Sequence, residues 1–518
     1  MKADYTKDIY RQLEELISKV ESLTDQVEQM TKEKKADKKR IKELEKTVER
    51  LAKKTDAQEL KLKEKDKEIA RLSKENDSLK KKNALLIEEV SRLKSVKNNN
   101  SNNSSLPPSS DQKGAKKANE YNSRKKTGKK RGGQEGHTGK TLTKETAEEL
   151  IASGTCKHTV LKHGKEQEGA YTTKYELDIS VELEVIEHRI YDDVAMPIFP
   201  DSEVFYGSKL KALVAMLYTV GAVSVKRIRE IIDSITGGVI RLSTGTIYGF
   251  CKKLSGQVKA SLDKIEEHIM DSTVAYTDAT VVTVDGKQAY IRNISCQDAV
   301  RYYAMQQKDL ESLGKIQLLA KFAGILVHDH ETSLYHFGIG HGECNVHLIR
   351  YLLKNTEDCS SHWSGKLTDL LYEMKKRRDE LVDNSDQRHL PEEELTKFFN
   401  RYDEIISEGR KENEKTQPKW AQKEENALLN RLEKYKSNHL MFLENFDVAF
   451  SNNMSERDLR KCKSRQKIAG GFRSASGIIL FANLLSFVET AKRLHCNVYE
   501  SILTAFKSSE PLFDFSEG

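Results

Sequence analysis

The N-terminal part of the chain carries one hydrophobic repeat that stays in phase from residue 9 to residue 97. Two positions of the heptad are apolar in 8 of 12 and 9 of 12 repeats, the first rich in β-branched residues and the second in leucine. Asn76 and Asn83 occupy the first position. This pattern is typical of a parallel two-stranded coiled coil in which buried asparagines define the register. A single charged helix is the alternative, but it does not explain so many heptads in phase. We therefore predict a dimerisation segment over residues 1–97.

Residues 98–145 are predicted to form a flexible basic linker. The stretch "KNNNSNNSSLPPSSDQ" has too few apolar residues to build a core. A dense basic run follows, which includes Lys125, Lys126, Lys129, Lys130 and Arg131. Such a segment is attracted to polyanions. A solvated tail is the alternative, but the position between an oligomerising segment and folded domains favours an arm that binds DNA or RNA.

Composition limits the class of protein. Charged residues make up 32% of the 518 residues and hydrophobic residues 37%, which indicates a large solvated element outside the core. The seven cysteines form no even framework, as expected in a reducing compartment. There is neither an apolar leader nor an apolar run of about 18 residues. We expect a soluble, intracellular protein.

Two smaller regions come next. Residues 146–204 alternate in "YTTKYELDISVELEVIEHRIYDDV" and are predicted to be a small β-rich module. Cys156, His158 and His163 precede this stretch, but a zinc ribbon needs paired Cys-x-x-Cys units and the region has none. Residues 205–262 are predicted to contain three helices.

The second and third of these helices resemble a helix-turn-helix, with Ser243 or Thr244 as N-cap. Thr244, Thr246 and Tyr248 would then begin a DNA-recognition helix. Packing of three helices without any DNA contact is the alternative.

From residue 263 the pattern changes to strand, strand, strand, helix, strand. Asp278 lies on the first strand and Asp329 ends the fourth, which is the order of an α/β ribonuclease-H-like core. In such a core two acids on neighbouring strands, with a third from a later helix, share divalent cations. The helical residues 357–445 are predicted to be an insertion that divides this domain into 263–356 and 446–518.

The third acid is predicted in "FSNNMSERDLRKCKSRQKIAGGFRS", where Glu456 stands among arginines and lysines. An exposed ion pair with Arg460, four residues on, is a sufficient account of Glu456 from the local sequence alone. Asp278 and Asp329 change that interpretation, because a ribonuclease-H-like site needs a third carboxylate. The adjacent basic residues are then explained as contacts to DNA phosphates.

Taken in order, these motifs resemble bacterial transposases of the insertion sequence 66 family, over nearly all of the chain. "NSSLPPSSD" with "GKKRGGQEGHTGKTL" is similar to the linker of the family, and "TDATVVTVDGKQAYI" to its first acidic strand. "GILVHDH" with "HGECNVHLIRYL" is similar to its second acidic strand, and the block around Glu456 to its most distinctive motif. The family often has a Cys-x-x-Cys module, of which "CKHTVLKHG" keeps one cysteine, so a metal there is in doubt.

The resemblance implies a DNA transposase that binds transposon ends and catalyses strand cleavage and transfer. Asp278, Asp329 and Glu456 would be both catalytic and metal-binding, with Mg²⁺, or Mn²⁺ in its place, as cofactor. Expected partners are double-stranded DNA, a second copy of the chain and helper proteins of the same element, in the bacterial cytoplasm. Predicted DNA contacts are Lys125, Lys126, Lys129, Lys130, Arg131, Thr244, Thr246, Tyr248, His347, Arg457, Arg460, Lys463, Arg465 and Arg473. The alternative is a non-catalytic, dimeric DNA-binding protein with a regulatory or architectural role.

Two Cys-x-x-His pairs could either bind a metal or pack against neighbouring helices. Cys344-x-x-His347 followed by Cys359-x-x-His362 has spacing that zinc proteins use. The resemblance supports the first pair as a recurring feature but not the second. We therefore expect packing near the active site, with His341 or His347 touching a substrate phosphate, and no zinc.

Overall fold

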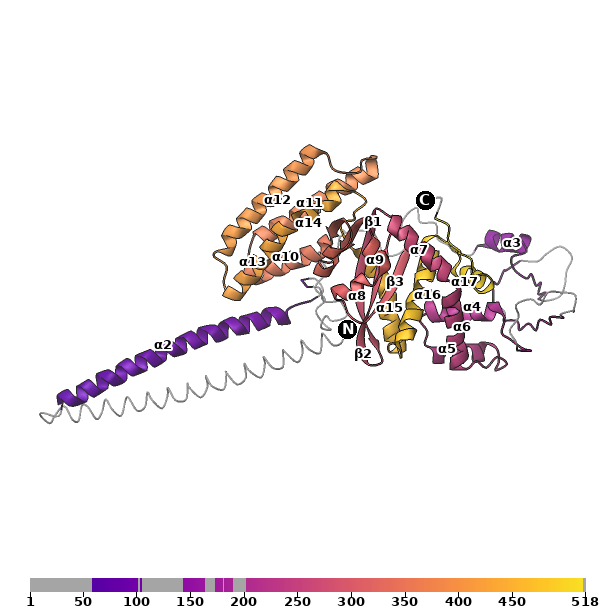
Figure 1. The fold of residues 1–518 in the computed structure, drawn as a ribbon, viewed down its shortest axis with the longest axis horizontal. Coiled ribbons are helices and arrows are strands. Elements are labelled where there is room, and N and C mark those ends of the chain that lie inside the picture. The colour runs from indigo at the N-terminus through magenta and orange to yellow at the C-terminus, as the bar shows by residue number, and fades with distance from the viewer. Residues whose placement is uncertain are drawn as a thin grey trace. The chain divides into compact units, whose positions relative to one another are not determined.

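The computed structural model describes residues 58–100, 103–104, 143–163, 173–179, 181–189 and 202–515 (Figure 1). The chain divides into two compact units. The smaller unit comprises Lys116–Phe205 and Arg229–Leu242. The larger unit comprises Met1–Ala115, Tyr206–Ile228 and Ser243–Gly518, and it contains the β-sheet and all three predicted acids.

The larger unit has a mixed α/β fold built on a five-stranded sheet in the order β3-β2-β1-β4-β5. The strands are β1 (Val274–Val284), β2 (Lys287–Ser295), β3 (Val300–Met305), β4 (Ile325–His328) and β5 (Gly340–Glu343). β1, β2 and β3 are antiparallel neighbours, whereas β4 is parallel to β1 and β5 is parallel to β4. Between β1 and β2, Asp285 and Gly286 have φ angles of 49° and 71°, the conformation that a two-residue hairpin turn requires.

The connection from β3 to β4 contains two short helices, α8 (Leu310–Gly314) and α9 (Gln317–Lys321), and the 3₁₀ helix η2 (Thr332–His336) follows β4. Two C-terminal helices pack against the antiparallel strands of the sheet: α15 (Asn453–Ala469) contacts β1 and β2, and α16 (Ala475–Arg493) contacts β3. Among the described helices, only α16 is long and apolar enough to cross a membrane, but 61% of that stretch is buried inside the fold. It is therefore a core helix by its burial.

Four helices directly precede the sheet. They are α4 (Ser208–Thr219), α5 (Val225–Ile235), α6 (Thr244–Gln257) and α7 (Lys259–Asp271). α4 and α6 contact each other, α16 and α17 (Val498–Lys507). Ser243 is the N-cap of α6, and its hydroxyl accepts a hydrogen bond from the backbone N–H of Thr246 at 3.0 Å. Of the two residues predicted as this cap, Ser243 and Thr244, the structure thus has the first.

Between β5 and α15 the chain is helical, as the sequence predicts. These helices are α10 (Asn345–Cys359), α11 (Trp363–Asn384), α12 (Glu392–Asn413), α13 (Lys419–Lys434) and α14 (Lys436–Glu444). Glu425 of α13 is fully buried and accepts hydrogen bonds from Trp363 of α11 (2.7 Å), Asn355 of α10 (3.1 Å) and Asn413 of α12 (3.0 Å). One carboxylate therefore joins four helices, because a buried charge must have its hydrogen bonds satisfied.

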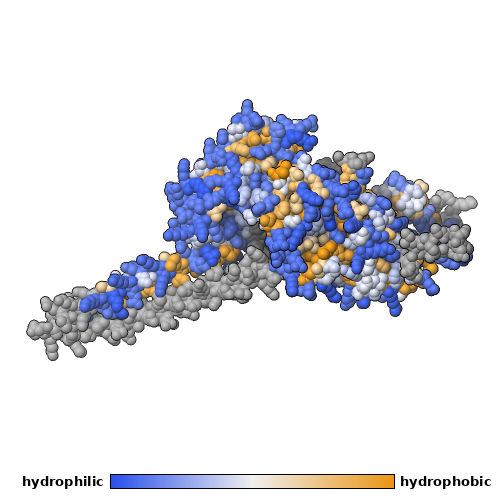
Figure 2. Space-filling view, viewed as in Figure 1, coloured by the Kyte–Doolittle hydropathy of each residue, from blue (hydrophilic) through white to orange (hydrophobic). Residues whose placement is uncertain are grey.

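The insertion and the sheet share one hydrophobic core. Val274, Tyr276 and Val327 of the sheet belong to the same buried cluster as Trp363 and Leu367 of α11. The outer faces of the insertion helices are mostly hydrophilic (Figure 2). Thus the helices between β5 and α15 pack directly against the sheet.

Two predicted regions are described only in part. Helix α2 (Gln58–Lys97) covers the last heptads, while the earlier heptads and the predicted basic residues 125–131 lie outside the described residues. In the region predicted to be β-rich, the described residues contain the helix α3 (Lys144–Ala152) and no strand. Since 164–172, 180 and 190–201 are not described, the β-rich module stays a prediction.

Candidate active site

Asp278 and Asp329 are brought together by the register of two parallel strands. β1 pairs with β4 through Val274 with Ile325 and Tyr276 with Val327. Continuing this register by two residues places Asp278 level with Asp329, one residue beyond the end of β4. Both carboxylates therefore lie at one edge of the sheet, although 50 residues separate them in the sequence.

The electrostatics of the two acids confirm that they are neighbours. Burial and the charge of Asp329 raise the pKa of Asp278 to about 6. Burial also acts to raise the pKa of Asp329, but the contact with His347 outweighs it and lowers that pKa below the ordinary value. The backbone N–H of Asp278 donates to Asn293 Oδ1 at 3.0 Å. Asp278 and Asp329 are both partly buried, and a cation shared by two neighbouring carboxylates would offset the repulsion between their charges.

Asn452, the N-cap of α15, ties that helix to both strands. It is fully buried, and its Nδ2 donates to the carbonyl oxygen of Thr277 at 2.9 Å and lies 3.4 Å from Asp329 Oδ1. Its backbone N–H donates to Cys344 Sγ at 3.2 Å. Glu456 stands in the first turn of α15, so the asparagine fixes the end of the helix that carries the third acid.

His347 lies between the second and third acids. Its Nδ1 is 3.2 Å from Asp329 Oδ1, and its Nε2 is 3.8 Å from Glu456 Oε1. Arg350 Nη1 also lies 3.0 Å from that Nε2. The structure thus joins Asp278 to Asp329 through the sheet register, and Asp329 to Glu456 through His347. His347, predicted to touch DNA, faces the acids, and its side chain is only 12% exposed.

A buried ion pair holds α15 against its neighbours two residues beyond Glu456. Asp458 lies 2.7 Å and 2.8 Å from Arg493 Nη2 of α16, and it accepts a hydrogen bond from Asn293 of β2 at 3.1 Å. Asp458 was not predicted as a site residue, because its neighbours in the sequence are those of an exposed acid on a basic helix. Its position two residues after Glu456 is the one sequence signal that could have suggested a role in holding the third acid.

The predicted DNA contacts divide by exposure. Arg457, Arg460 and Arg473 are exposed, and Lys463 is partly buried. Arg465 is buried: its guanidinium donates to the carbonyl oxygen of Val223 at 2.5 Å and lies 4.3 Å from the centre of the Tyr218 ring. The charge of Arg465 is thus used inside the fold, and its contact with DNA stays a prediction.

At the start of α6, Thr244 is exposed and Thr246 is partly buried. Tyr248 is partly buried as well, and its hydroxyl donates to Ser476 Oγ at 3.5 Å, at the first turn of α16. These three residues remain predictions as DNA contacts. At this end of α6, Thr244 is accessible to a ligand, whereas Tyr248 contacts α16.

The two Cys-x-x-His pairs do not meet. Cys359 Sγ donates instead to Asn355 Oδ1 at 3.4 Å, and burial raises the pKa of its thiol to about 12. Within the described part of the chain, the group of side chains with metal-ligand geometry is Asp329, Cys344 and His347, whose ligand atoms all lie within 4.8 Å of one another. His341 contacts His328, with 3.3 Å between ring nitrogens.

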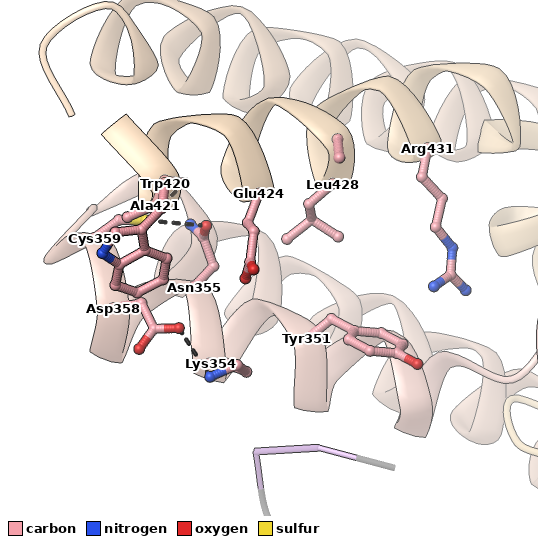
Figure 3. Close-up of a pocket in the computed structure, with 11 residues that line it drawn as sticks. Tyr351, Lys354, Asn355, Asp358, Cys359, Trp420, Ala421, Glu424, Leu428 and Arg431 are labelled. Carbon is pink, nitrogen blue, oxygen red and sulfur yellow. Dashed lines mark hydrogen bonds and ion pairs between the residues drawn. The ribbon is translucent and has the colours of Figure 1, made fainter. Parts of the chain in front are cut away.

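A hollow of about 320 Å³ lies between α10 and α13 (Figure 3). Its lining includes Tyr351, Trp420 and Leu428, with the ion pair of Lys354 and Asp358 at 2.9 Å. None of the three predicted acids lines it. The candidate active site is therefore the edge of the sheet where β1, β4 and α15 meet, and not this hollow.

Comparison with known proteins agrees with the geometry. A search among curated proteins finds no match. The family model described as transposase IS66 family matches residues 203–479, a little over half of the chain. The matched segment runs from the helices before the sheet to the first turn of α16, and it includes the three acids, Asn452 and His347. The chain therefore belongs to the IS66 family of transposases.

Proposed function

We propose that this chain is a DDE-type DNA transposase that binds transposon ends and catalyses strand cleavage and strand transfer with Asp278, Asp329 and Glu456. The observation that supports the proposal is the register of β1 and β4, which brings Asp278 level with Asp329, together with His347, which contacts Asp329 and lies 3.8 Å from Glu456 in the first turn of α15. A ribonuclease-H-like core is inferred from the sheet, in which a three-stranded antiparallel meander is followed by parallel strands in the order β3-β2-β1-β4-β5.

The donor set fits Mg²⁺ or Mn²⁺. All three side chains are carboxylates, the ligands that hard cations prefer. Burial and the charge of Asp329 raise the pKa of Asp278, and a bound cation would counteract both effects. Bound there, two such ions would stabilise the attacking and leaving oxygens of an in-line phosphodiester displacement. The protein itself supplies position: Asn293 holds the backbone of Asp278, and Asn452 holds Asp329 and the start of α15.

The surroundings suit a nucleic-acid backbone. Arg457 and Arg460 are exposed on α15, whose first turn carries Glu456, and cationic side chains at this place would hold phosphates next to the acids. A coiled coil over residues 1–97 would join two protomers and hence two transposon ends. Helper proteins of the same element and a cytoplasmic, nucleoid-associated location are part of the same proposal.

The test uses a plasmid that carries the DNA flanking the coding sequence. The purified full chain should cut it with Mg²⁺ or Mn²⁺ and not in excess EDTA, if necessary with the proteins encoded beside it. Asp278→Asn, Asp329→Asn and Glu456→Gln should each lower cleavage by on the order of a thousandfold while gel-shift binding persists. Asp447→Asn, an exposed acid nearby, is the matched control and should cleave normally.

Full cleavage by any one of the three variants would overturn the triad. If the wild-type chain binds the DNA but never cuts it with either metal, even with the neighbouring proteins, the proposal also fails. That outcome would favour the non-catalytic, DNA-binding alternative.

A further inference from the structure

One acid of the proposed triad is grouped with two side chains that the triad does not use. Asp329 follows β4, Cys344 is the N-cap of α10, and His347 lies in the first turn of α10. One ligand atom from each lies within 4.8 Å of the others. The sequence pairs Cys344 and His347 with Cys359 and His362, but in the fold Asp329 takes the place of that second pair.

The ring of His347 is placed as a metal ligand would be. Its Nδ1 is buried and makes no hydrogen bond of acceptable geometry, although Asp329 Oδ1 is only 3.2 Å away. Two atoms bound to one tetrahedral zinc ion at about 2.05 Å are about 3.3 Å apart. The separation of these two atoms therefore fits a shared ion, which would replace the ion pair that they form without metal.

Cys344 supplies the third donor. Its side chain is almost completely buried, and its Sγ accepts the backbone N–H of Asn452 at 3.2 Å. It also stands at the N-terminus of a 15-residue helix. A thiolate with an imidazole selects Zn²⁺ and similar borderline-soft ions over Mg²⁺.

We propose that Asp329, Cys344 and His347 form a binding site for Zn²⁺ or a similar thiophilic divalent cation, with the fourth position open to water. On binding, the thiol of Cys344 releases its proton to solvent and the sulfur becomes the ligand. This inference shares Asp329 with the proposed function. Because Zn²⁺ held there occupies the Asp329 carboxylate, the site is inhibitory towards Mg²⁺-dependent cleavage.

Arg350 is the group that opposes this site. Its Nη1 lies 3.0 Å from His347 Nε2, which can accept that N–H only when it carries no proton. A metal on Nδ1 leaves the ring proton on Nε2, so this nitrogen must release Arg350 and turn towards Glu456 Oε1, 3.8 Å away. Removing the arginine charge in Arg350→Gln should therefore tighten metal binding by about tenfold.

The experiment titrates the metal-free full chain with Co²⁺, which takes the ligands of zinc and absorbs strongly in the near ultraviolet when a thiolate binds it. One Co²⁺ per chain should give this thiolate band, and Zn²⁺ should abolish it by displacement. Cys344→Ser should lose the band. Cys359→Ser, which removes a cysteine from the other end of the same helix, should keep it. His347→Gln should weaken Co²⁺ affinity by at least about tenfold.

Circular dichroism of each variant separates loss of a ligand from loss of folding. If Cys344→Ser fails to fold, the decision rests on His347→Gln and on the wild-type chain with Co²⁺. A wild-type chain without the thiolate band, or a folded Cys344→Ser that keeps it, overturns the proposal. Asp278→Asn should keep the band while losing cleavage. Thus failure of the zinc site and failure of the triad give different results.

Discussion

Asn452 donates its side-chain amide to the carbonyl oxygen of Thr277, 2.9 Å away, one residue before Asp278. The same amide lies 3.4 Å from Asp329, and the asparagine caps the helix that carries Glu456. A single buried side chain therefore contacts or adjoins every element that bears an acid of the proposed triad.

Replacing this asparagine should disturb the acids without removing one. Asn452→Ala should lower stability by about 1–3 kcal/mol, because the carbonyl of Thr277 loses its buried partner. Cleavage should fall about ten- to a hundredfold, as for other residues that orient metal ligands, with a higher Mg²⁺ concentration needed for half-maximal rate. Asn453→Ala changes an exposed neighbour and serves as the control. Equal effects of both variants would contradict a positioning role for Asn452.

The basic residues of α15 should separate into two classes. Arg457→Ala and Arg460→Ala should weaken DNA binding and reduce the slope of log affinity against log salt by about one each, because each removes one phosphate contact. Gel shifts at several salt concentrations measure this slope. A slope unchanged by both substitutions would show that this helix does not contact the backbone.

Arg465→Ala should behave differently. Because Arg465 is buried and donates to the carbonyl of Val223, its loss should lower stability by about 2 kcal/mol and leave the salt slope unchanged. Thermal unfolding and the same gel shifts measure both effects. A lower salt slope with unchanged stability would show that the side chain reaches DNA after all.

Glu343, the last residue of β5, carries the charge network that joins the insertion to the sheet. It is buried, and it contacts His330, Tyr335, Arg431 of α13 (2.6 Å) and His439 of α14 (3.2 Å). Burial acts to raise its pKa, but hydrogen bonds from His330 and His439 and the charge of Arg431 outweigh it and lower the pKa well below the ordinary value of 4.5.

Glu343→Gln should destabilise the chain by about 3–5 kcal/mol, because it leaves a buried arginine without its counter-charge. Glu433→Gln, which breaks the partly exposed pair with Arg410, should cost less than about 1 kcal/mol. Since the folded pKa of Glu343 is depressed, its contribution is fully present above pH 4.5 and is lost as the pH falls through the folded value. The difference in melting temperature between wild type and Glu343→Gln should therefore shrink below that pH. A difference independent of pH would exclude the charge as its cause.

The predicted coiled coil gives a test at the other end of the chain. Removal of residues 1–97 should convert a dimer into a monomer in sedimentation equilibrium. Replacing Asn76 and Asn83 by isoleucine should instead raise thermal stability and allow other oligomeric states, because the buried asparagines limit register and strand number. A truncated chain that remains dimeric would place the main dimer interface elsewhere.

The sequence alone determined the features that depend on local pattern. The turn between β1 and β2 falls on Asp285 and Gly286, an Asp-Gly pair that adopts left-handed φ angles readily. The cap of α6 follows from the hydroxyl of Ser243. Helical periodicity likewise predicted the insertion between β5 and α15. The family resemblance, which rests on motifs in order, was confirmed by the match over residues 203–479.

Only the tertiary structure decided which of these residues meet. Arg465 looks like its exposed neighbours in sequence, yet the helix rotation turns it into the core beside Tyr218. Cys344 and His347 meet Asp329 rather than Cys359 and His362, because a strand end and a helix N-terminus converge there. Sequence spacing records only position along one chain, whereas the side chains of a site come from elements whose pairing depends on long-range packing. For this protein the local elements were thus readable from sequence, and the chemistry of the site was decided by how β1, β4, α10 and α15 pack together.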